Sequence, residues 1–162
     1  DKIPSYAFLN CRNLTKLEFS DNSMLEEIED GAFFGCSGLE KIVITGSVKH
    51  LGDYAFAFCR KVSATAFLKI DLLQNIGKGA FIYCESLPYF QLPRELERIR
   101  TRTFYGCSRL KFIKIPDKVL YINHQAFRKC PLLSSVTILS EDIMISNSAF
   151  DAHTKIRTWQ KQ

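Results

Sequence analysis

The stretch that decides the fold is Leu110–Ser134, which reads LKFIKIPDKVLYINHQAFRKCPLLS. In this stretch the apolar residues Ile113 and Ile115 alternate with other residues. Further on come Ala126-Phe127 and then Cys130, three residues after that phenylalanine. The same pattern returns along the chain on seven anchor phenylalanines: Phe8, Phe33, Phe56, Phe81, Phe104, Phe127 and Phe150. The intervals between them are 25, 23, 25, 23, 23 and 23 residues, so the sequence predicts a repeat protein.

Each anchor has the same neighbours. Alanine precedes every anchor except Phe104, and a cysteine lies three residues after every anchor except Phe150, where His153 takes its place. Leucine, valine or isoleucine follows six residues after each anchor, and most units add apolar residues nine and eleven residues after it. This L-x-x-L-x-L pattern is the strand signature of leucine-rich repeats. In the third unit, Thr65 and Phe67 stand nine and eleven residues after the anchor, and the polar Thr65 predicts a phase shift of that strand.

Burial explains why such units stack. One unit of 23 residues cannot cover its own apolar face, so neighbouring units must join their phenylalanines, leucines and isoleucines into a continuous core. Side chains alternate across a strand, and copies of the strand are expected to align as a parallel sheet with a spacing of about 4.8 Å. We therefore expect an α/β repeat solenoid in which the Ala-Phe-x-x-Cys segments form short helical turns on the convex side.

The unit at Leu110–Ser134 resembles the BspA-type (Treponema pallidum-type) leucine-rich repeat, and the resemblance covers nearly the whole chain. It implies a right-handed leucine-rich-repeat superhelix with a concave parallel β-sheet. Members of that family are typically surface or secreted proteins of bacteria and some protists, implicated in adhesion. The resemblance thus implies a cell-surface or secreted location and a protein partner, such as a host or extracellular-matrix protein. A cytoplasmic scaffold is the alternative.

The domain organisation follows from the repeat. Residues 1–162 are expected to form a single domain of about seven repeats. The protein is expected to be a monomer. The chain enters in mid-repeat without a polar capping unit, so a truncated N-terminus is expected. Residues 141–162 depart from the pattern and are predicted to be a degenerate C-terminal cap, with Trp159 as a lid. No run of 18 apolar residues occurs, which argues against membrane insertion.

The cysteines and histidines could carry chemistry. Six thiols could form disulfides, a metal site or a nucleophile, but their spacing of 23 to 25 residues matches no C-x-x-C pattern. Their identical place in each repeat favours small buried hydrophobic side chains. His50, His124 and His153 lie in different units, and no H-E-x-x-H, G-x-S-x-G or P-loop pattern is present. We therefore expect no enzymatic activity, no metal and no cofactor.

Two surfaces are candidates for binding. The first is formed by outward positions of the predicted concave sheet: Lys41, Val43, Tyr89, Gln91, Phe112 and Lys114. Exposed aromatic rings beside a charge mark binding surfaces more often than exposed aliphatic side chains do. These residues predict a non-catalytic protein-binding or adhesion module of a larger protein. The alternative is a structural or scaffold solenoid that presents other domains and has no dedicated ligand.

The second candidate is a basic edge. Residues 94–118 contain eight Lys and Arg against three Asp and Glu, while the rest of the chain is balanced. Its centre is formed by Arg98, Arg100 and Arg102. Nucleic acid is not favoured, because this segment lacks the interleaved aromatic residues of a single-strand binder. A solvated edge, or a surface for an acidic protein or glycan, remains open.

Overall fold

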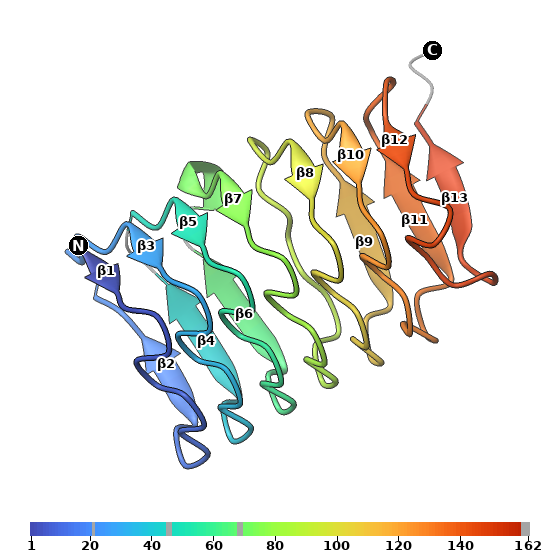
Figure 1. Ribbon diagram of the computed structural model, residues 1–162. Helices are drawn as coiled ribbons and strands as arrows, with labels where there is room; N and C mark the ends of the chain where they lie inside the picture. Colours follow the sequence, from blue (N-terminus) through green and yellow to red (C-terminus); the bar gives the residue numbers. More distant parts are fainter. Residues whose placement is uncertain (21, 45–46, 68–69, 160–162) are drawn as a thin grey trace.

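The computed structural model of the chain describes residues 1–20, 22–44, 47–67 and 70–159. The chain coils into two rows of parallel strands on opposite sides of the core (Figure 1). The long-strand row contains β2 (Lys16–Glu18), β4 (Lys41–Ile44), β6 (Ala64–Phe67), β9 (Phe112–Ile115), β11 (Ser135–Ile138) and β13 (Lys155–Thr158). The short-strand row contains β1 (Lys2–Ile3), β3 (Glu27–Ile28), β5 (His50–Leu51), β7 (Asn75–Ile76), β8 (Arg98–Ile99), β10 (Tyr121–Ile122) and β12 (Met144–Ile145). We number the turns of the coil as rungs 1 to 7, after their anchor phenylalanines.

The anchor phenylalanines form one stack through the core. Successive ring centroids from Phe8 to Phe150 are 5.0 to 5.5 Å apart, and successive ring planes are within 9° of parallel. The rings of rungs 2 to 6 are completely buried, and leucine, isoleucine and valine side chains from both strand rows pack around them. The predicted stacked core is therefore present.

The long strands pair in one register. Thr65 lies opposite Ile42 of the preceding rung, so the phase shift predicted for the third unit is wrong. The row is divided into the sheets β2-β4-β6 and β9-β11-β13. The residues before β4, β6 and β9 donate their amides to the preceding rung, as Ser63 does to the Glu40 carbonyl at 3.0 Å. Pro88 occupies that position in rung 4 and has no N–H, which interrupts the ladder there.

The Ala-Phe-x-x-Cys segments are not helical, which corrects the prediction of short helical turns. Within the described residues the structure has no α-helix, and its one 3₁₀ turn is η1 (Ile70–Leu72), outside those segments. In rung 2 the amides of Gly31, Phe33 and Gly35 donate to the next rung at 2.8 Å, while those of Ala32, Phe34 and Cys36 close turns within their own rung. An α-helix would direct all of these amides along its own axis. The segment is therefore a run of tight turns.

These turns require a left-handed backbone at two positions per rung. The residues two before and two after the anchors of rungs 1 to 6 all have φ between 55° and 74°. Glycine tolerates this conformation, but Tyr54, Phe58 and Tyr83 adopt it as well. Tyr54 also covers the next rung at Gly79, where an added Cβ would lie 2.5 Å from its ring. The close approach of that ring thus requires glycine at Gly79, and glycine also adopts its φ of 59° without strain.

The last rung continues the long-strand row. Strand β13 pairs with β11 in register, from Ser135 opposite Lys155 to Ile138 opposite Thr158. Ile156 is 45 % exposed and Trp159 is 63 % exposed, so both keep much of their surface in solvent, and a cap formed by residues 141–162 stays a prediction. Across the described ranges, no helix has the length and apolarity that a bilayer span requires.

We predict that Phe81→Ala lowers the free energy of unfolding by about 3–5 kcal/mol, because it removes a fully buried ring from the middle of the stack. Phe8→Ala should cost clearly less, because the Phe8 ring is 41 % exposed and stacks on one anchor ring only. Urea unfolding of both variants measures the difference. Equal and small losses would contradict a continuous core.

Candidate binding surface

Tyr89 and Phe112 lie side by side on the outer side of the long-strand row, which we call the long-strand face and which is the predicted concave face. Tyr89 is 42 % exposed and Phe112 is 58 % exposed. Their backbones form an isolated parallel bridge, and their rings stack with centroids 5.7 Å apart and planes at 23°. Strand alternation turns these rings outward while their neighbours Phe90 and Ile113 are buried. The structure therefore brings together the two aromatic residues that the sequence singled out.

The other predicted residues of this face differ in exposure. Gln91 and Lys114 are exposed next to the aromatic pair. Lys41 is exposed on rung 2, so it is separated from Tyr89 by rung 3. Val43 lies on strand β4, between β2 and β6, and is only 9 % exposed. The expectation that Val43 belongs to an exposed apolar stripe is therefore wrong.

The surface is hollowed on both sides of Phe112. One hollow of about 590 Å³, the central hollow, is lined by residues that include Tyr89, Gln91, Arg94 and Phe112. A larger one of about 890 Å³, the acidic hollow, extends from Phe112 across rungs 6 and 7 to Trp159. Both hollows are lined by Phe112, Lys114, Asp117 and Leu139. The aromatic pair thus stands between two concave surfaces rather than on a flat sheet.

Loops that follow the long strands supply much of the acidic hollow. They contribute Asp117, Leu120, Leu139, Ser140, Glu141, Asp142 and Trp159. Sequence analysis did not propose any of these as binding residues. The departure of residues 141–162 from the repeat, which includes Trp159, was the one available signal. Residues so far apart in the sequence meet because successive rungs place their loops side by side.

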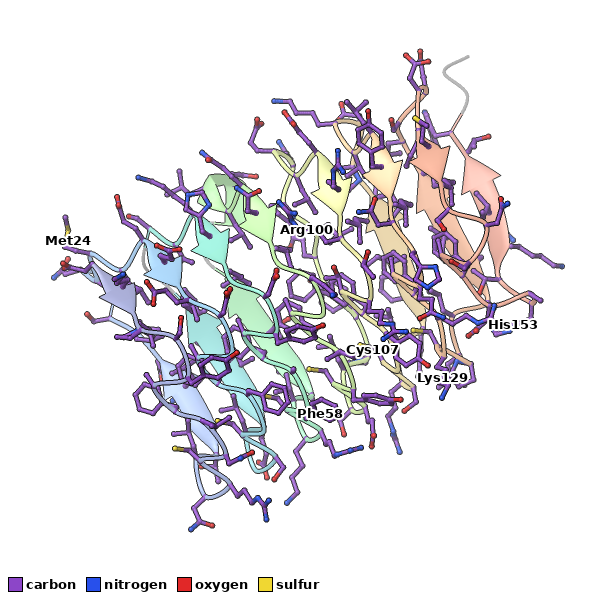
Figure 2. The ribbon with its side chains drawn as sticks, viewed as in Figure 1. Met24, Phe58, Arg100, Cys107, Lys129 and His153 are labelled. Atoms are coloured by element: carbon purple, nitrogen blue, oxygen red, sulfur yellow. The ribbon has the colours of Figure 1, made fainter. Side chains whose placement is uncertain are left out.

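The three arginines of the predicted basic edge do not form one patch. Arg98 lies over the Tyr121 ring at 4.3 Å, and with Arg100 it lines a hollow of about 390 Å³ that also contains Glu95 and Glu97. Arg102 instead donates to Gln125 at 2.7 Å and lies over the Tyr105 ring at 5.5 Å. In Figure 2, Arg100 lies beside β8, and Phe58 and Lys129 lie among the tight turns. Arg98 and Arg102 thus pack on tyrosines of two different regions.

Five cysteines form a second ladder beside the phenylalanine stack. The thiols of Cys36, Cys59, Cys84, Cys107 and Cys130 donate to the carbonyl of the preceding anchor phenylalanine at 3.1 to 3.3 Å. All five are buried, Cys11 is exposed, and all six are free thiols. The expectation of buried side chains thus holds for five of the six, but these are also hydrogen-bond donors between rungs.

Burial sets the reactivity of these thiols. It raises the pKa of Cys36 to about 11 and that of Cys130 to about 12, and it also raises the pKa of Cys59, Cys84 and Cys107. Since the thiolate is the nucleophilic form, the five buried thiols are inert at neutral pH. Within the described residues, no group of three or more His, Cys, Asp or Glu side chains could hold a metal ion.

The parallel strand rows and the stacked anchors define a leucine-rich-repeat solenoid. The model of the BspA type leucine rich repeat region matches residues 1–73 and 74–161 in six copies, so the chain belongs to the BspA-type leucine-rich-repeat family. Among solved structures, a leucine-rich repeat protein of T. pallidum is 30 % identical with a TM-score of 0.70, over 76 % of this chain and 58 % of that one. No curated protein matches the chain significantly.

Two further structures share the fold. A leucine-rich repeat protein from Bacteroides ovatus is 24 % identical with a TM-score of 0.76, over 98 % of this chain and 45 % of that one, which is a likeness of fold alone. A leucine-rich cell surface protein from Faecalibacterium prausnitzii is 28 % identical with a TM-score of 0.67, over 87 % and 43 % of the two chains. The chain therefore spans about half the length of these solved relatives.

We predict that one thiol of the native protein reacts quickly with Ellman's reagent and five react slowly. Cys11 is exposed, whereas the other five are buried and protonated. In denaturant without reductant, all six should react at once. The measurement is the absorbance time course, with Cys11→Ser as the control that removes the fast phase. Two or fewer reactive thiols in denaturant would contradict a reduced cysteine ladder.

The buried thiols should also make stability fall at alkaline pH. Their pKa values are raised above the ordinary value of 9.0, so from about pH 9 to 11 the unfolded chain loses protons that the native chain keeps. The contribution of these thiols to the free energy of unfolding is therefore complete below pH 9 and declines as the pH rises above it. Urea unfolding at several pH values measures this, and Cys84→Ala with Cys107→Ala should flatten the decline. An unchanged slope in that variant would contradict the assignment.

Proposed function

We propose that this chain is a non-catalytic protein-binding module whose long-strand face contacts the partner around Tyr89 and Phe112. The observation that carries the proposal is the exposed, stacked aromatic pair between two hollows. Binding energy at protein interfaces is concentrated in a few residues that are rich in aromatic rings and fill or border pockets. Exposed aromatic rings that border hollows are thus the features that support a binding site on this face.

The fold supports the proposal through rigidity. The Tyr89–Phe112 pair rests on a core whose rings and strands are locked to their neighbours, so its side chains are held in place before a partner arrives. A surface that is ordered in advance loses less entropy on association. An extended segment of the partner is the shape that the two adjoining hollows would accommodate. Gln91 and Lys114 would contribute polar contacts at the edge of the aromatic pair.

We further propose that the module acts at the cell surface or in secreted form, in adhesion to a protein partner and as part of a larger protein. Membership of the BspA-type family and the similarity to a leucine-rich cell surface protein support this location. The larger protein is supported by the length of the solved relatives, of which this chain covers about half.

We predict that Tyr89→Ala combined with Phe112→Ala weakens binding of peptides at least tenfold, because both aromatic contacts are lost. The probes are peptides selected from a phage-displayed random library on the immobilised wild-type protein, then labelled and measured by fluorescence anisotropy. The melting temperature should stay nearly unchanged, since both rings are exposed on the long-strand face.

Two control variants locate the site. Leu132→Ala combined with Met144→Ala removes exposed apolar side chains away from the face and should bind like the wild type. Arg98→Glu combined with Arg100→Glu should do the same. If the selected peptides bind the aromatic variant normally but lose binding to the arginine variant, the binding site is the basic edge and the proposal is wrong.

A further inference from the structure

The lining of the acidic hollow has an excess of carboxylates. In the part of the chain that the structure describes, Asp117, Glu141 and Asp142 line it, and Lys114 is the one cation of the lining. Among the described residues six ion pairs form, and none of them involves these three carboxylates. Most of those pairs join a cation to a carboxylate of a neighbouring rung. The hollow is therefore lined by a net negative charge whose carboxylates are not held in ion pairs of 4 Å or less.

Ser140 adds a polar side chain to the lining of this hollow. Ser140 lines the hollow and is only 6 % exposed, and its hydroxyl forms no hydrogen bond with any described residue. By contrast, Thr103, which is the other buried polar residue among those described, donates to the Arg100 carbonyl at 2.9 Å. No fully buried side-chain oxygen of the described residues lacks a partner, so the Ser140 oxygen keeps some contact with solvent and can accept or donate a hydrogen bond there. A donor group inside the hollow would supply the partner that Ser140 lacks.

The walls of the hollow are apolar. Phe112 and Trp159 supply aromatic rings, and Leu120 and Leu139 add aliphatic surface. The three carboxylates do not converge tightly enough to hold a metal ion. Separated carboxylates beside aromatic rings suit a cation that has several donors and an apolar stem. An arginine or lysine side chain meets both requirements, because its methylene groups pack on apolar surface while its charged end reaches polar groups.

We propose that the acidic hollow receives an arginine or lysine side chain from an extended segment of the partner protein. This inference rests on the proposed binding function of the long-strand face and names the chemistry of its partner. Arginine fits better, because its planar guanidinium stacks on an aromatic ring while its five N–H groups reach carboxylates and the Ser140 oxygen together.

Trp159 allows a direct test, because it is the one tryptophan of the chain and lines this hollow. The probes are two capped peptides, Gly-Leu-Arg-Leu-Arg-Leu-Gly and its analogue with glutamine in place of arginine. The arginine peptide should change the tryptophan emission saturably, and its affinity should fall as salt is raised. The glutamine peptide should bind at least tenfold more weakly.

Variants test the lining itself. Asp117→Asn with Glu141→Gln and Asp142→Asn should weaken the arginine peptide at least tenfold. Glu40→Gln with Asp71→Asn and Glu97→Gln is the matched control: it changes the net charge equally at exposed carboxylates outside both hollows, and binding should stay within twofold of the wild type. Ser140→Ala should weaken binding several-fold and leave the melting temperature nearly unchanged.

The outcomes separate this inference from the proposed function. Equal binding of both peptides, no effect of the carboxylate variant, or no change in Trp159 emission at millimolar peptide would overturn the inference. The aromatic variant could still lose the library-selected peptides in that case, and the binding face would stand. The arginine peptide could instead change the Trp159 emission while the library-selected peptides bind the Tyr89→Ala, Phe112→Ala variant as well as the wild type. The proposed face would then be wrong, and the hollow would remain a binding site for cationic side chains.

Discussion

Ring stacking between successive rungs is the constraint on which this structure depends. The anchor rings are 5.0 to 5.5 Å apart, close to the strand spacing of about 4.8 Å, so the core and both strand rows share one repeat distance. No rung can bury its ring alone, because each ring face is covered by the ring of the next rung. The inward positions therefore hold mostly apolar residues, whereas the residues of the outward positions and loops can vary.

The same constraint decides how much of the fold could be predicted. Inward residues repeat because the stack demands it, so the anchors, the parallel register and the outward direction of Tyr89 and Phe112 follow from spacing alone. The turns could not be predicted, because Ala-Phe-x-x-Cys also has the spacing of a helical face. Hydrogen bonds to the next rung, such as that from the Phe33 amide to the Ala55 carbonyl at 2.8 Å, decide against the helix. Such bonds are a property of the stack and not of a single repeat.

Less of the candidate site could be predicted, for a related reason. Alternation tells which residues face outward but not how far their neighbours cover them, so Val43 was expected to be exposed and is buried. The acidic hollow draws on loops of three rungs, and the lengths and courses of those loops are not constrained by the stack. Ser140 and Trp159 are 19 residues apart in the sequence and line the same hollow. Only the stacking of one rung on the next brings them together.

The placement of charge along the long-strand face gives the proposed interaction a direction. On rung 1 Lys16 is paired with Glu18, so that part of the face offers little net charge. The central hollow holds Arg94 and Lys114 against Asp117, whereas the acidic hollow holds Asp117, Glu141 and Asp142 against Lys114. The net charge of the lining is therefore positive in the central hollow and negative in the acidic hollow. A segment that sets its basic side chain beside Trp159 would be repelled if it were shifted by one hollow, since its cation would then meet Arg94. Charge of this kind adds less to affinity than to register. The aromatic pair would hold the segment, and the carboxylates would decide where along the face it lies.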